Sequence, residues 1–129
     1  MLTFDNKLAG TIQIEKHFSE DDICSIVVGA MEGGISYWAV LEKDEHWDDK
    51  PNEEPASTWA TKLLLEKKTI KFSDVEDPAE VWKLSLDKLL NGIKQNATYR
   101  PEESDLEQAD AGTYDRIFQY ALFNKIEFG

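Results

Sequence analysis

The period of the hydrophobic pattern changes at Gly33-Gly34, and this change limits the possible folds more than any other feature of the sequence. After the two glycines, residues 35–42 are apolar on both alternations of a strand. We therefore predict a helix that begins at Ser19, a left-handed cap at the glycines, and an inner strand covered on both faces. The helix prediction rests on apolar residues at three- and four-residue spacing: Ile23, Ile26, Val27, Ala30 and Met31.

The rest of the chain continues to alternate between strand-like and helix-like segments, and Asp77-Pro78 marks the turn of a hairpin. The pattern predicts one α+β domain over residues 1–129, with a mixed or antiparallel sheet and helices packed on it. Its element order is β-α-β-α-β-β-α-α-β. The predicted strands are 10–18, 35–42, 68–77, 80–86 and 125–128, and the predicted helices are 19–31, 56–66, 87–96 and 113–123.

The charge balance favours some classes of partner and disfavours others. The chain has 26 acidic and 14 basic residues, for a net charge of −12. Such a surface repels nucleic-acid phosphates and anionic membranes and attracts basic protein surfaces, so we expect no direct nucleic-acid or membrane partner. Cys24 is the only cysteine, which fits a reducing cytoplasm, and the first residues do not resemble a signal peptide.

Two connections hold many of the acids, 42–55 with seven and 98–110 with five. Either they are solvated loops, or residues 42–54 and 102–110 within them bind a partner by imitating the phosphate backbone, with Trp47 as an aromatic anchor. The candidate partner-binding residues are Asp44, Glu45, Trp47, Asp48, Asp49, Glu53, Glu54, Glu102, Glu103 and Asp105.

No motif for catalysis or cofactor binding is complete. Residues 29–34, "GAMEGG", lack the Lys-Ser/Thr of a phosphate-binding loop, and Cys24 follows three acids that disfavour a thiolate. "DEHWDD", residues 44–49, offers oxygen ligands but lacks the glycine of a calcium loop. We predict no enzyme activity, cofactor or metal, with a weak calcium site at 44–49 as the alternative.

Two segments resemble those of small acidic proteins of bacteriophages and prophages. The matches are Glu32, Gly33, Gly34, Tyr37 and Trp38, then Gln119, Tyr120, Ala121, Leu122 and Phe123. Many members of that family have Gly where this chain has Asn124, and both residues tolerate a left-handed cap. The resemblance implies a bacterial host cytoplasm and, by association, action against host defence.

Three functional hypotheses follow, and we favour the first. The protein inhibits a host immune or nucleic-acid-processing protein, such as a nuclease or CRISPR effector, through its acidic surface. Alternatively, it is an oligomeric sponge for a host signalling nucleotide, or a phage replication accessory protein whose last helix forms a subunit interface. The sponge would use a pocket formed by Tyr37, Trp38, Arg100, Arg116 and Tyr120.

Overall fold

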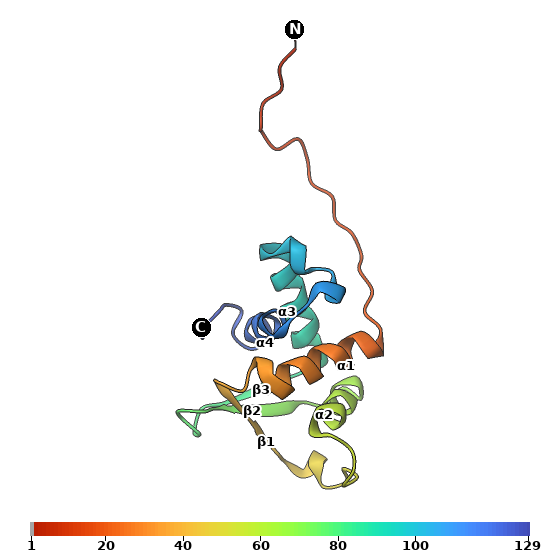
Figure 1. Ribbon diagram of the computed structural model, residues 1–129, viewed down its shortest axis with the longest axis vertical. Helices are drawn as coiled ribbons and strands as arrows, with labels where there is room; N and C mark the ends of the chain where they lie inside the picture. The colour runs from red at the N-terminus through yellow and green to blue at the C-terminus, as the bar shows by residue number, and fades with distance from the viewer. Residues whose placement is uncertain (1) are drawn as a thin grey trace.

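A computed structural model describes residues 2–129 as four α-helices and one three-stranded antiparallel sheet (Figure 1). The predicted α+β class is confirmed. The α-helices are α1 (Glu20–Gly29), α2 (Ala56–Leu65), α3 (Leu86–Tyr99) and α4 (Ala111–Phe123). The strands are β1 (Ala39–Glu42), β2 (Ile70–Asp74) and β3 (Val81–Leu84). The shorter helical turns are η1 (Ala30–Gly34), η2 (Glu45–Trp47), η3 (Pro101–Glu103) and η4 (Leu106–Gln108).

The ends of α1 and α4 follow from their local sequence. The Ser19 hydroxyl accepts the Asp22 N–H at 3.1 Å, and the Asp22 carboxylate accepts the Ser19 N–H at 2.9 Å. This reciprocal cap satisfies backbone donors that a helix leaves unpaired. The last helix ends at Asn124, whose φ of 59° is the left-handed cap predicted from the sequence.

The junction at Gly33-Gly34 differs from the prediction. The chain continues through the π-helical turn η1, and Gly33 has an extended φ of 171° instead of a left-handed one. Gly34 is required by packing, because a Cβ built there would lie 2.9 Å from the carbonyl oxygen of Ala111 at the start of α4. The predicted left-handed turn is therefore wrong, and the helical chain does not end at Met31 as predicted, since α1 ends at Gly29 and η1 continues to Gly34.

The sheet has the order β1-β2-β3, so β2 is the central strand and β1 lies at an edge. The prediction of an inner strand over 35–42 is therefore wrong. Residues 35–38 form a turn, and Val40 is 48% exposed on the outer face. The predicted hairpin is confirmed, with Phe72 opposite Trp82. On the inner face, Phe72 meets Phe118 of α4 edge-on, with ring centroids 6.0 Å apart.

The two terminal strands of the predicted order are absent from the described residues. Segment 10–18 is extended and, apart from half-buried Phe18, exposed. Segment 125–128 is also irregular, although Phe128 packs against the core. Strand formation requires hydrogen-bonding neighbours, and neither segment pairs with a strand of the sheet among the described residues. Among residues 2–129, no helix has both the length and the apolar character needed to cross a membrane.

Candidate functional site

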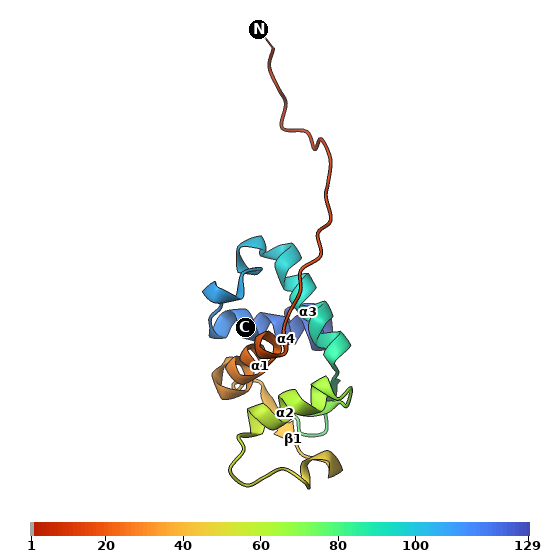
Figure 2. The ribbon, with the colours of Figure 1, turned by 90° about the vertical axis from the view of Figure 1, so that its right-hand side faces the viewer.

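The two acid-rich connections predicted as partner-binding lie at opposite ends of the molecule. Figures 1 and 2 show the segment between β1 and α2 beyond the sheet, and the segment between α3 and α4 at the far end of the helical layer. Since the helical layer separates them, they do not form one continuous surface. The candidates among them that are exposed are Glu45, Asp48, Asp49, Glu53, Glu102 and Asp105.

The other acidic candidates make contacts within the protein. Asp44 pairs with Lys71 at 3.5 Å, and Glu54 lies 3.8 Å from the Lys62 ammonium. Glu103 accepts from Nε of Arg116 at 3.2 Å. Burial opposes ionisation of Glu103, but the hydrogen bonds and charge of Arg116 outweigh it and lower the pKa of Glu103.

The predicted aromatic anchor, Trp47, belongs to the core. Its side chain is only 7% exposed, and η2 turns it inward beneath the loop. The Lys43 ammonium lies 5.9 Å from the centroid of its ring. Because the ring is buried, it is not available to a partner that contacts the loop from outside.

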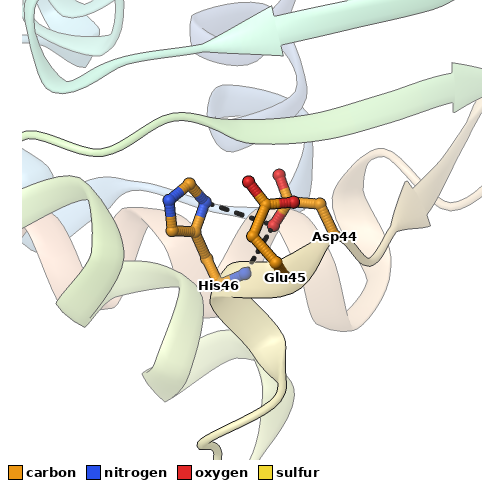
Figure 3. A group of neighbouring side chains, drawn as sticks. All are labelled: Asp44, Glu45 and His46. Atoms are coloured by element: carbon orange, nitrogen blue, oxygen red, sulfur yellow. Dashed lines mark hydrogen bonds and ion pairs between the residues drawn. The ribbon is translucent and has the colours of Figure 1, made fainter.

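Three side chains of the β1–α2 loop lie close enough together to hold a metal ion: Asp44, Glu45 and His46 (Figure 3). Asp44 already accepts the His46 N–H at 3.0 Å, and Nδ1 of His46 lies 3.2 Å from the same oxygen. Burial would raise the pKa of Asp44, but the His46 N–H and the charges of His46 and Lys71 lower it. These contacts make Asp44 a cap for η2.

The five residues of the alternative nucleotide pocket have different environments. Trp38 is 2% exposed and lies in the core, while Tyr120 is 8% exposed and stacks on exposed Tyr99 at 5.6 Å. Arg116 is held by Glu103, and Arg100 is exposed at the end of α3. Tyr37 is half-exposed beside Trp38. None of the five lines the groove beside the β2–β3 turn or the groove between α1 and α2.

Tyr37 and Trp38 instead join α4 through Asp115. The Tyr37 hydroxyl donates to Oδ2 of Asp115 at 2.6 Å, and Nε1 of Trp38 donates to Oδ1 at 2.7 Å. Desolvation, followed by the hydrogen bond and the charge of Asp115, raises the pKa of Tyr37 to about 12. Trp38 also meets the ring of Phe123, with centroids 5.5 Å apart, so the two segments that carried the phage resemblance are in direct contact.

Gln119 extends this network to the C-terminal tail, residues 125–129. Its buried side-chain oxygen accepts the N–H groups of Glu127 and Phe128, both at 2.7 Å. Its amide nitrogen donates to Asp115 at 2.9 Å and to the Phe128 carbonyl at 3.1 Å. The side chain of Gln119 thus supplies the hydrogen bonds that a neighbouring strand would give the tail.

The tail completes an aromatic cluster of Trp38, Trp82, Phe123 and Phe128. Phe128 stacks on Trp38 with ring centroids 5.1 Å apart, and Trp82 meets Phe123 edge-on at 4.9 Å. These geometries are favourable for aromatic pairs. Trp38 is buried, while the other three rings are half-buried and reach the surface together.

A groove opens over these three rings, and we define it as the acidic groove. Its rim combines the β2–β3 turn with the C-terminal tail, which carries Lys125 and Glu127 3.0 Å apart. The groove contains four carboxylates and one ammonium group, for a net charge of −3. Its lining residues are Asp74, Asp77, Glu80, Trp82, Phe123, Lys125, Glu127 and Phe128.

The residues of the acidic groove were missed by the analysis of the sequence. The run "SDVEDPAE", residues 73–80, contains four acids and could have been identified as a third acidic segment. This segment lies beside Phe123 and Phe128 only because the C-terminal tail docks there. The hydrophobic pattern of the tail does not predict that docking. No protein-family model, curated protein or solved structure matches the chain.

Proposed function

We propose that the protein binds a basic segment of a partner protein in the acidic groove and acts as an inhibitor of that partner. The observation that carries the proposal is the combination of an aromatic floor with a carboxylate rim. An arginine or lysine side chain can lay its stem on Trp82 while its charged head meets the carboxylates. Neither an acidic loop nor an aromatic patch alone provides both interactions.

Charge supports a basic partner at this place. The ion pairs among residues 2–129 involve none of Asp74, Asp77 and Glu80, so these rim carboxylates have no cation of their own. Asp74 and Asp77 accept N–H groups within their turn at 2.8 and 3.2 Å, which fixes their direction. A partner's guanidinium would therefore meet carboxylates that are already oriented.

The phage resemblance suggests the class of partner. We propose a host defence or nucleic-acid-processing protein, such as a nuclease or a CRISPR effector, in the bacterial cytoplasm. Such proteins hold nucleic acid with lysine and arginine side chains, and the groove would compete for them. In this proposal the chain binds without catalysing a reaction and needs no cofactor.

A defined peptide tests the groove. We expect an arginine-rich peptide to shift the indole N–H resonance of Trp82 and to bind more weakly as salt rises, because screening reduces the attraction. The double variant Asp77→Asn, Glu80→Gln removes two rim charges and is expected to weaken binding about tenfold or more. An acidic peptide of equal length is the negative probe.

The matched control is the double variant Asp48→Asn, Glu53→Gln, which removes the same charge from the β1–α2 loop. Both of its side chains are exposed. If the control loses peptide binding and the groove variant retains it, the loop is the binding surface and the groove proposal is wrong. The same pair of variants, used to capture partners from a host lysate, tests whether the natural partner uses the groove.

A further inference from the structure

The N-terminal arm, which we define as residues 2–18, exposes a row of large apolar side chains. The arm has no net charge, since Asp5 and Glu15 balance Lys7 and Lys16, so the whole charge of −12 belongs to the body. The exposed fractions are 86% for Leu2, 93% for Phe4, 83% for Leu8, 85% for Ile12 and 81% for Ile14. An apolar row of this kind, outside any core, indicates an interaction surface.

Figures 1 and 2 both show the arm running from the start of α1 away from the sheet of its own chain. Its root is fixed by Phe18, which packs against the core, and by Lys16, whose ammonium donates to the Ser104 carbonyl. Beyond this root the sequence alternates, with Ile12 and Ile14 on one face and Thr11 and Gln13 on the other. The arm thus has a strand pattern and no strand partner among residues 2–129.

The sheet has one edge that fits such a strand. The Val75 N–H donates to the Trp38 carbonyl at 3.0 Å, and bonded pairs alternate along an antiparallel ladder. The N–H and C=O groups of Ala39 and Leu41 therefore point away from β2. The Ala39 N–H is bonded to Ile35, whereas the main-chain groups of Leu41 have no partner among residues 2–129.

The opposite edge, at β3, is partly blocked. The Asp74 N–H donates to the Glu80 carbonyl at 3.0 Å, so the same alternation directs the main chain of Lys83 to the outside. The Lys88 ammonium lies 2.8 Å from that Lys83 carbonyl and occupies it. Lysine at an edge discourages pairing with another strand. The two edges are therefore not equivalent, and β1 is the open one.

We infer that residues 10–16 of one copy add as a fourth strand to the β1 edge of a second copy, in a reciprocal dimer. Main-chain hydrogen bonds to Leu41 would supply affinity. Burial of Ile12 and Ile14 would determine which face of the added strand turns toward the partner. Each apolar side chain of the arm covers roughly 100 Å². With the rest of the arm also lying on the partner, the five apolar side chains of each arm and the surface they cover reach about 2,000 Å², which is the range of a specific interface.

Light scattering on the full chain, from about 1 µM to about 1 mM, tests the dimer. We expect a dimer whose dissociation constant rises at least about tenfold in the variant Ile12→Asp, Ile14→Asp. The matched control, Thr11→Asp, Gln13→Asp, adds the same charge to the other face and is expected to change it less than about threefold. All four positions are exposed, so both variants are expected to fold like the parent chain.

A crosslink shows which chain provides the strand. In a Cys24→Ser background, Gln13→Cys on one copy and Glu42→Cys on a second, size-tagged copy are expected to form a mixed disulfide. A chain carrying both cysteines that closes on itself as a monomer would overturn the inference, as would a monomer at every concentration.

The dependence on salt separates this inference from the proposed function. Added salt screens the repulsion between two bodies of charge −12, so the dimer is expected to strengthen. Binding of a basic peptide in the acidic groove is expected to weaken under the same conditions. The dimer and the binding of the basic peptide can therefore be disproved independently of each other.

Discussion

The two ends of the chain have similar sequence patterns and different structures. Both the N-terminal arm and the C-terminal tail read as short strands, and neither forms one. The tail is nevertheless fixed, because Gln119 bonds its main chain on both sides and Phe128 enters the aromatic cluster. Beyond its root, the described part of the arm has only the local bond from the Lys7 N–H to the Asp5 carboxylate. Both ends contain large apolar side chains, but only the tail has hydrogen-bond partners for its main chain in the body of the protein. We therefore attribute the docking of the tail to those partners more than to its apolar side chains.

The largest expected effect comes from removing the ring on which the tail packs. Trp38→Ala should lower the free energy of unfolding by about 3–5 kcal/mol, because it empties a buried site and removes the partner of Phe128. Urea unfolding measures the loss. Trp38→Phe keeps an aromatic ring against Phe128 and loses the bond to Asp115 and part of the ring volume, so a larger loss in the Phe variant than in the Ala variant would contradict this explanation.

The second test removes the hydrogen bonds of the tail and keeps its packing. Gln119→Met should cost about 1–3 kcal/mol, since it leaves the Glu127 and Phe128 N–H groups unpaired. Hydrogen exchange at these two amides should accelerate, while exchange in the arm stays the same. Gln95→Met is the control, because Gln95 lies only at the edge of this region and bonds Asn124. Unchanged protection of the tail would show that aromatic packing alone holds it.

Acid is expected to weaken the connection between α3 and α4, to which the root of the arm is bonded. Ser104, which holds Lys16, follows Glu103, and the pKa of Glu103 is lowered from a reference value of 4.5. Its stabilisation is therefore present above pH 4.5 and is lost as the pH falls through the lower folded value. Glu103→Gln should cost about 1–2 kcal/mol at neutral pH and flatten this part of the pH profile. Urea titrations at several pH values measure it, and an unchanged profile would contradict the assignment.

The smallest effect on stability is expected from the arm. Ile12→Ser at concentrations where the protein is monomeric should change the free energy of unfolding by less than about 0.5 kcal/mol, because the side chain is exposed. Amides 11–15 should exchange freely in dilute solution and become protected at high concentration. Protection of the arm in dilute solution would instead show that it docks on its own sheet.

The helices could be predicted from sequence because their determinants are local. Ser19 and Asp22, the stripe that contains Ile26, and Asn124 each act within a few residues of one helix. The strands were less predictable, because a strand is defined by neighbours distant in the sequence, and β1 proved to be an edge. The prediction that Trp47 is exposed was wrong for a similar reason. The 3-10 turn η2 directs this residue of an acidic loop into the core.

The acidic groove could be predicted only in part. Its rim at 74–80 is visible as a run of acids, but its floor requires Trp82, Phe123 and Phe128 to meet. That meeting depends on Gln119, a buried polar side chain whose partners lie eight and nine residues further along the chain. No periodicity marks such a residue before the structure is known.

The close approach of Gly34 to Ala111 has a consequence for how such chains can evolve. A side chain at position 34 would strike the main chain of α4, and no replacement at position 111 removes a carbonyl oxygen. A homologue that lacks this glycine must therefore have moved the start of its last helix, and with it the residues that hold the tail. We expect the two segments to be inherited as a unit, so that the glycine and the Gln119 position are retained or lost together.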